Sequence, residues 1–159
     1  MDGREEKERA KNLHHLATEK MRRGLLNEAL VDLEQAIQLT AGKPLYVSQY
    51  GLCLAQGDQL DRGLDFCRRA AKASPRDPYV HINLGRVYRI VGDKAAAHRC
   101  FMDAWRVDRR NSAAAAELAR MGVRRPPVLP FLPRSHWCNR KLGQWRFQIE
   151  RALVPQAAR

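Results

Sequence analysis

Cysteine and histidine, the side chains that most often bind metals or act as nucleophile and base, are scattered along this 159-residue sequence. The four cysteines are 14, 33 and 38 positions apart, and no two of them have the Cys-x-x-Cys spacing of a zinc site. Cys67 falls where apolar residues recur, so we interpret it as a small buried hydrophobe. Thiols without a disulfide pattern suit a reducing compartment, and we therefore expect a cytoplasmic protein.

Catalytic motifs are also missing from the sequence. There is no phosphate-binding glycine loop, no His-Glu-x-x-His pair and no Gly-x-Ser-x-Gly turn. We therefore predict that the protein is not an enzyme and uses neither a cofactor nor a metal. No apolar run approaches the ~18 residues of a transmembrane segment, and the charged N-terminus lacks the apolar core of a secretory signal. These exclusions direct attention to binding.

Positive charge is concentrated in the last quarter of the chain. Residues 1–119 hold 20 Lys and Arg against 16 Asp and Glu, whereas residues 120–159 hold nine against Glu150 alone. Four prolines between 126 and 133 favour an extended linker, and Arg124-x-x-Pro127-x-x-Pro130 formally matches an SH3-ligand pattern. The segment is therefore a separate candidate binding unit.

An amphipathic helix is expected after this linker, from about Asn139 to Leu153. A basic helix of this kind can dock on its own domain, on a partner protein, on nucleic acid or on an anionic membrane surface. The sequence leaves these alternatives open. Its candidate contact residues are Trp137, Lys141, Trp145, Arg146, Ile149 and Arg151.

A 34-residue repeat organises the chain before this segment. When the sequence is written in rows of 34 residues that begin at Ala10, Pro44 and Pro78, the rows align without gaps. Residues at equivalent positions of the three rows form a column, and small residues occupy two of these columns. Such a period is typical of stacked helical units that bury a core only against one another. The small columns let paired helices approach closely. They hold Ala17, Gly51 and Gly85 in one position and Ala29, Gly63 and Ala97 in the other.

Apolar spacing within each row predicts two helices, with breaks near Gly24, Gly57 and Gly92. A half-row follows, in which Ser112 is the predicted N-cap of an alanine-rich capping helix that ends near Gly122. The predicted organisation has four parts. It comprises a charged extension of the first helix (1–9), the array with its capping helix (10–121), a proline-rich linker (122–138), and a basic helix and tail (139–159).

The third row reads Leu84-Gly85-x-x-Tyr88 and then Ala97-x-x-x-Phe101. This pattern resembles the consensus of the tetratricopeptide repeat (TPR) family. The resemblance covers about residues 5–121. It implies an all-α, right-handed solenoid of three helix-turn-helix units plus a capping helix, followed here by the proline-led tail with its amphipathic helix.

The resemblance also implies that the first helix of each unit lines a concave groove that binds a partner protein or peptide. Helical spacing identifies, on each of these helices, the face that lies beside the row of core-packing apolar residues, and this face is expected to line the groove. Its apolar centre and flanking cations suit a segment with acidic residues. The candidates are Lys11, His14, Thr18, Met21, Leu45, Ser48, Leu52, Tyr79, Ile82, Asn83, Arg86 and Arg89.

The best-known TPR ligand site is a clamp of charged side chains around a peptide C-terminus. The corresponding positions hold His14, Thr18, Gln49, Tyr79 and Asn83. Since none of them keeps the clamp's cation, we do not expect that type of binding. The sequence therefore predicts a non-catalytic adaptor or scaffold, with nucleic-acid binding through the tail as the alternative. It does not define the oligomeric state.

Overall fold

The computed structural model describes residues 3–122 together with Lys141, Leu142 and Trp145. The chain divides into two units, residues 1–122 and residues 123–159. Within residues 3–122 the chain forms seven helices and no strand, and none of these helices is long and apolar enough to cross a membrane. The helices are α1 (Gly3–Arg22), α2 (Leu26–Leu39), α3 (Pro44–Gln56), α4 (Leu60–Ala73), α5 (Pro78–Val91), α6 (Lys94–Val107) and α7 (Ser112–Arg120).

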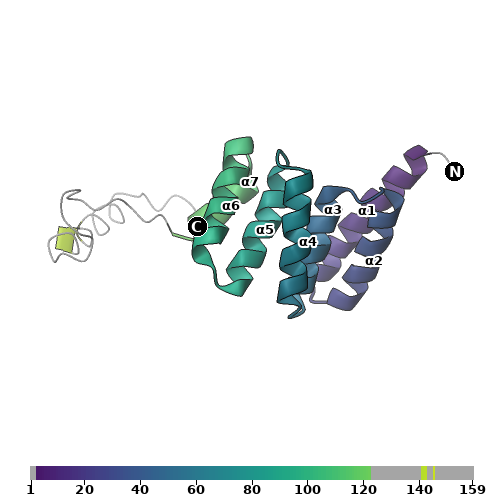
Figure 1. Cartoon of the computed structure of the whole chain (residues 1–159), viewed down its shortest axis with the longest axis horizontal. Helices are drawn as coiled ribbons and strands as arrows, with labels where there is room; N and C mark the ends of the chain where they lie inside the picture. The colour runs from purple at the N-terminus through teal and green to yellow at the C-terminus, as the bar shows by residue number, and fades with distance from the viewer. Residues whose placement is uncertain (1–2, 123–140, 143–144, 146–159) are drawn as a thin grey trace, which may run out of the picture. The chain divides into compact units, whose positions relative to one another are not determined.

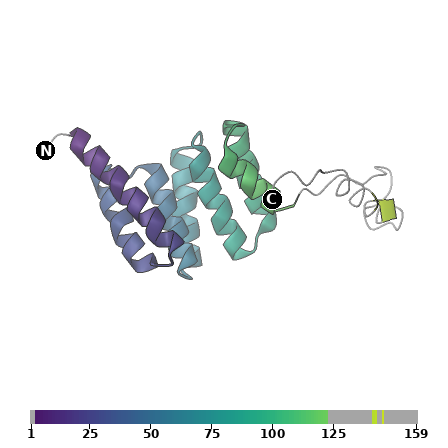
Figure 2. The ribbon, with the colours of Figure 1, turned by 180° about the vertical axis from the view of Figure 1, so that it is seen from behind.

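Six of the helices form three hairpins, α1–α2, α3–α4 and α5–α6, which pack one against the next (Figure 1). The seventh, α7, packs on α5 and α6. Helices α2, α4 and α6 lie on one side of the array, and α1 comes to the front when the molecule is turned round (Figures 1 and 2). We call the side formed by α1, α3, α5 and α7 the first-helix face. The predicted all-α array of three helix-turn-helix units and a capping helix is thus confirmed.

The helix ends follow from local chemistry. Pro44 and Pro78 each open a helix, where a missing backbone N–H leaves no hydrogen bond unmade. The Asp77 carboxylate accepts a hydrogen bond from the backbone N–H of Tyr79 at 2.9 Å. At the start of α7 the side chain of Asn111 accepts one from Ala114 at 3.0 Å. The N-cap of α7 is therefore Asn111, and Ser112, the predicted cap, is the first helical residue.

Asp58 explains why the turn glycine of the second repeat comes one residue early. In the first and third repeats, Gly24 and Gly92 have φ of 81° and 92°, the left-handed region that favours glycine. Asp58 occupies the same column and has φ of 64°, while the preceding Gly57 has φ of −94°. The left-handed residue of the turn therefore lies at the same position in all three repeats, and aspartate is one of the few residues other than glycine that tolerate this conformation.

Small residues hold the paired helices close together, as the two columns predict. A Cβ added to Gly63 would lie 2.5 Å from the backbone oxygen of Gly51, so α3 and α4 meet backbone to backbone. A Cβ on Gly85 would lie 2.5 Å from the ring of Phe101, which has no exposed surface. The core is therefore a series of small clusters between neighbouring helices, with no central mass of large side chains.

The three described cysteines are buried and free, in line with the interpretation of Cys67 as a core residue. Burial raises the pKa of Cys53 and of Cys100 to about 11 and that of Cys67 to about 12, from an ordinary value of 9.0. Cys138 lies outside the described residues.

These thiols are expected to resist alkylation in the native protein at about pH 8 and to react once urea unfolds it. Mass spectrometry of iodoacetamide-treated protein tests this. The folded state holds the thiols protonated, so the stability they contribute is fully present below pH 9.0 and is lost as the pH rises towards 11. Rapid labelling of Cys67 in the native state, or unchanged stability across that pH range, would contradict this prediction.

Candidate functional site

Eight of the twelve residues predicted to bind a partner have exposed or partly exposed side chains. Four of them lie on α1, and three of these four, His14, Thr18 and Met21, contact side chains of α3. The Gln49 amide donates a hydrogen bond to the Thr18 hydroxyl at 3.0 Å. Tyr79 is 52% exposed at the start of α5. The eight are Lys11, His14, Thr18, Met21, Leu45, Tyr79, Arg86 and Arg89.

The other four candidates are buried, and the prediction that they contact a ligand is corrected. Leu52 is 4% exposed in a cluster with Leu84 and Val87 of α5, and Ile82 is 1% exposed against residues of α6 and α7. Ser48 and Asn83 bond to each other, the amide donating to the hydroxyl at 2.9 Å. The physical reason is that α3 packs directly on α5, and α5 on α7. Part of the face that helical spacing leaves free is therefore covered by the next repeat.

A hollow of about 980 Å³ lies between the N-terminal half of α1, the α2–α3 corner and the start of α3. It includes three of the predicted residues, on two helices. The N-terminal turns of α1 form one wall, and they extend beyond the neighbouring helices (Figures 1 and 2). The hollow is lined by Gly3, Glu6, Lys7, Glu8, Lys11, His14, His15, Leu39, Thr40, Ala41, Gly42, Lys43, Pro44, Leu45 and Tyr46.

Aromatic rings and cations line this hollow together. The rings of His14 and Tyr46 stack with centroids 4.7 Å apart, and the Lys43 ammonium lies 4.8 Å from the centre of the tyrosine ring. Burial lowers the pKa of His14, and the nearby His15 and Lys43 act in the same direction, which favours a neutral ring. Its Nε2 atom is buried and has no hydrogen-bond partner among the described residues. The hollow thus combines partly apolar walls with three lysines and two glutamates, and the unpaired imidazole nitrogen lies beneath its surface.

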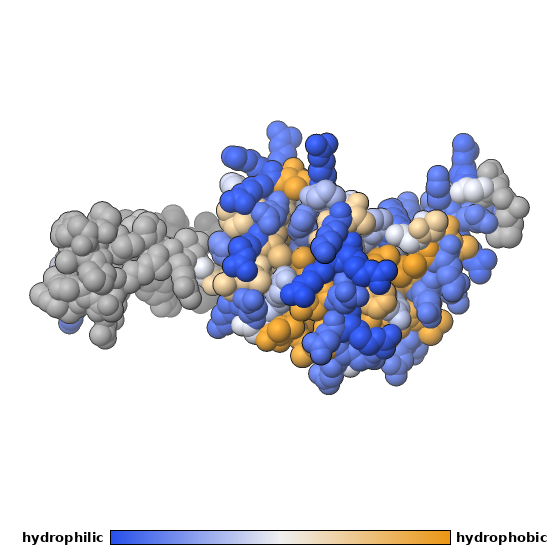
Figure 3. Space-filling view, viewed as in Figure 1, coloured by the Kyte–Doolittle hydropathy of each residue, from blue (hydrophilic) through white to orange (hydrophobic). Residues whose placement is uncertain are grey.

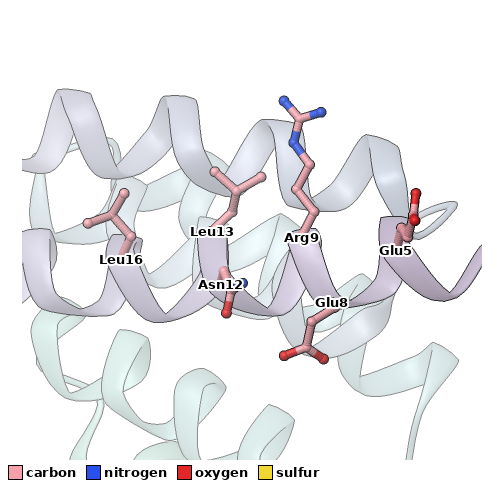
Figure 4. A pocket seen from close by; sticks show the side chains of 6 residues that line it. All are labelled: Glu5, Glu8, Arg9, Asn12, Leu13 and Leu16. Carbon is pink, nitrogen blue, oxygen red and sulfur yellow. The ribbon is translucent and has the colours of Figure 1, made fainter. Parts of the chain in front are cut away.

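A second hollow, of about 480 Å³, is shallow and lies on α1 alone (Figure 4). Its two leucines are flanked by charged side chains, and Leu16 is 48% exposed. The residue in the same column of the third repeat, Leu84, is 8% exposed because α4 packs against its helix. None of the predicted binding residues lies here. The lining residues are Glu5, Glu8, Arg9, Asn12, Leu13 and Leu16.

An ion-pair network that the sequence analysis missed joins α5 to α7. The Arg86 Nε and one terminal nitrogen of Arg89 each donate to a carboxylate oxygen of Glu117 at 2.7 Å. Glu117 is 1% exposed, and Arg120 approaches the same carboxylate at 3.6 Å. A signal was present in the repeat, because Glu117 shares a column with Asn83 and is the sole acidic residue of an alanine-rich helix.

Of the six predicted tail residues, two lie within the described part of the chain. Trp137, Arg146, Ile149 and Arg151 lie outside the described residues, as does most of the expected helix. Lys141 and Trp145 are helical and exposed. Nothing in the described part of the chain supports the nucleic-acid alternative. Among the described residues there is also no group of three His, Cys, Asp or Glu side chains that could hold a metal.

Comparison with known proteins gives structural matches only, since no family model matches the sequence and no curated protein matches it significantly. The first TPR domain of human RPAP3 has a TM-score of 0.59 at 12% identity over 71% of this chain and 89% of that one. The Sgt2 TPR domain from Aspergillus fumigatus has a TM-score of 0.59 at 16% identity, over 70% and 76%. The first TPR of Spaghetti (RPAP3), bound to the HSP90 peptide SRMEEVD, has 0.57 at 12% identity, over 72% and 91%. The helical array of this protein has the fold of a TPR domain.

Proposed function

We propose that this protein is a non-catalytic interaction module, an adaptor or scaffold, whose first-helix face binds a protein segment that carries acidic and apolar residues. The observation that carries the proposal is the 980 Å³ hollow between α1 and α3. Its volume is at the upper end of the range of about 300–1,000 Å³ that is typical of ligand-binding pockets. The free cysteines are compatible with a reducing compartment such as the cytoplasm.

The lining of the hollow determines which segment would fit. Lys7, Lys11 and Lys43 supply three ammonium groups, and the Lys11–Glu8 pair at 3.5 Å is exposed, so it is weak and easily exchanged. Beside them Leu45 provides a partly exposed apolar surface, backed by the buried Tyr46. An acidic side chain would meet the lysines while an apolar neighbour covers the leucine. The structural neighbour bound to SRMEEVD shows that a TPR domain accommodates an acidic peptide, although the clamp positions of this chain lack the clamp's cations.

Charge reversal at the three lysines tests this proposal. We expect Lys7→Glu, Lys11→Glu and Lys43→Glu together to weaken binding of labelled acidic–apolar peptides by about tenfold or more, because three favourable charge contacts become repulsive. Fluorescence anisotropy with a peptide array, each acidic peptide paired with its amide counterpart, measures the effect. Leu45 and Tyr46 are unchanged in this variant, so the loss reports charge.

The control reverses two lysines, against three in the test variant, on the opposite side of the array. Lys72 on α4 and Lys94 on α6 are exposed, and Figure 3 shows mostly hydrophilic side chains over these helices. Lys72→Glu with Lys94→Glu should leave peptide affinity within about twofold of the original. Failure of the unaltered protein to bind any acidic peptide, or equal losses in the two variants, would refute the proposed site.

A further inference from the structure

Glu117 is a buried carboxylate held by arginines that remain partly open to solvent. The side chains of Arg86 and Arg89 are 35% and 43% exposed, whereas that of Glu117 is 1% exposed. Arg120, 67% exposed, lies 3.6 Å from the same carboxylate. Three guanidinium groups therefore surround one negative charge, and a net positive charge remains at this end of the first-helix face.

The guanidinium groups have donors to spare. Each guanidinium carries five N–H donors, and the hydrogen bond of Arg86 or Arg89 to Glu117 uses one of its nitrogens. Paired donors in a planar fork are suited to a carboxylate, which can accept from two of them at once. The site thus has the chemistry of a carboxylate receptor, and Glu117 is the carboxylate that fills it.

The helix that supplies Glu117 has few other strong contacts. It is nine residues long, shorter than any other helix of the array, and its buried residues are Ala114 and Glu117. Ala113, Leu118 and Met121 add partly buried contacts. Since burial of an alanine removes little apolar area from water, the ion pairs are a large part of what keeps α7 on α5. An acidic group that competed for the arginines would weaken the docking of α7.

We propose that Arg86 and Arg89 of α5 form a subsite for an acidic side chain of the bound segment, and that Glu117 occupies this subsite while no ligand is bound. A ligand carboxylate then replaces Glu117, and α7 leaves α5. This inference rests on the proposed function, because it assigns a second contact to the same acidic segment. It differs from the clamp of other TPR proteins in position, since the residues at those places are His14, Thr18, Gln49, Tyr79 and Asn83.

The test replaces Glu117 with the neutral amide of the same shape. Glu117→Gln removes the competing charge, and we expect it to bind an acidic peptide several-fold more tightly than the unaltered protein. The control is Asp103→Asn, which makes the same change in net charge at an exposed carboxylate that pairs with Arg106 at 3.0 Å. Asp103→Asn should leave the affinity unchanged. Circular dichroism confirms that both variants are folded.

A second measurement uses the unaltered protein and does not depend on whether the variant folds. Saturation with the acidic peptide should accelerate amide hydrogen exchange in α7 (Ser112–Arg120) at least several-fold, whereas its amide counterpart should have no effect. Unchanged or slower exchange in α7 would overturn the inference, as would equal affinity of the two variants. If peptide binds without either effect, the subsite is wrong and the proposed function stands; if no peptide binds any variant, both fail.

Discussion

Replacing Gly63 with alanine is expected to lower the free energy of unfolding by about 2 kcal/mol, although the first and third repeats carry alanine at this position. The added Cβ would lie 2.5 Å from the backbone oxygen of Gly51 and 2.9 Å from the Cβ of Ala55. Backbone atoms cannot rotate away, so α3 and α4 must separate, at a cost of about 3 kcal/mol. The better helix propensity of alanine offsets about 1 kcal/mol of that cost.

Urea unfolding followed by circular dichroism measures the change. The matched control is Ala97→Gly, at the corresponding position of the third repeat, where alanine is buried and fits. It should also destabilise, through the lower helix propensity of glycine and the lost methyl contacts, by about 2 kcal/mol. A Gly63→Ala protein that is more stable than the original would show that α3 and α4 are not in backbone contact.

The 34-residue columns predicted the hairpin contacts because those contacts are local. Gly51 faces Gly63, and Gly85 faces Phe101, within single hairpins whose geometry the repeat itself defines. The same columns fix where each turn lies, even where an aspartate replaces glycine, as at Asp58. Periodicity therefore suffices for the order of helices, the close approaches and most of the core.

The candidate site was harder to predict because it depends on contacts between repeats. Helical spacing places Leu52 and Ile82 on a face, but it does not say that the neighbouring first helices cover that face. The pairing of Arg86 with Glu117 joins residues 31 positions apart, and the hollow requires the N-terminal turns of α1 to reach the α2–α3 corner. The ion pair and the hollow both depend on the distance between the first helices of neighbouring repeats. This distance cannot be derived from a single sequence.

The pair formed by Gly85 and Phe101 gives the second large expected effect, and it can be tested against the first repeat of the same chain. Gly85→Ala alone should cost about 2 kcal/mol, because its Cβ would lie 2.5 Å from the ring of Phe101, which is fully buried and has no room to move. Phe101→Leu alone should cost about 1.5 kcal/mol through the smaller buried area and the space it leaves.

The variant that combines Gly85→Ala with Phe101→Leu should lose less free energy of unfolding than the two single variants lose together. In the first repeat the same two columns hold Ala17 and Leu33, both with no exposed surface, so alanine opposite leucine is a combination that this hairpin geometry already accommodates. We therefore expect Gly85→Ala with Phe101→Leu to recover about 2 kcal/mol relative to additivity. A double-mutant cycle by urea unfolding measures this coupling. Additive costs would mean that the clash at Gly85 does not arise from the Phe101 ring, and that the third hairpin differs in geometry from the first.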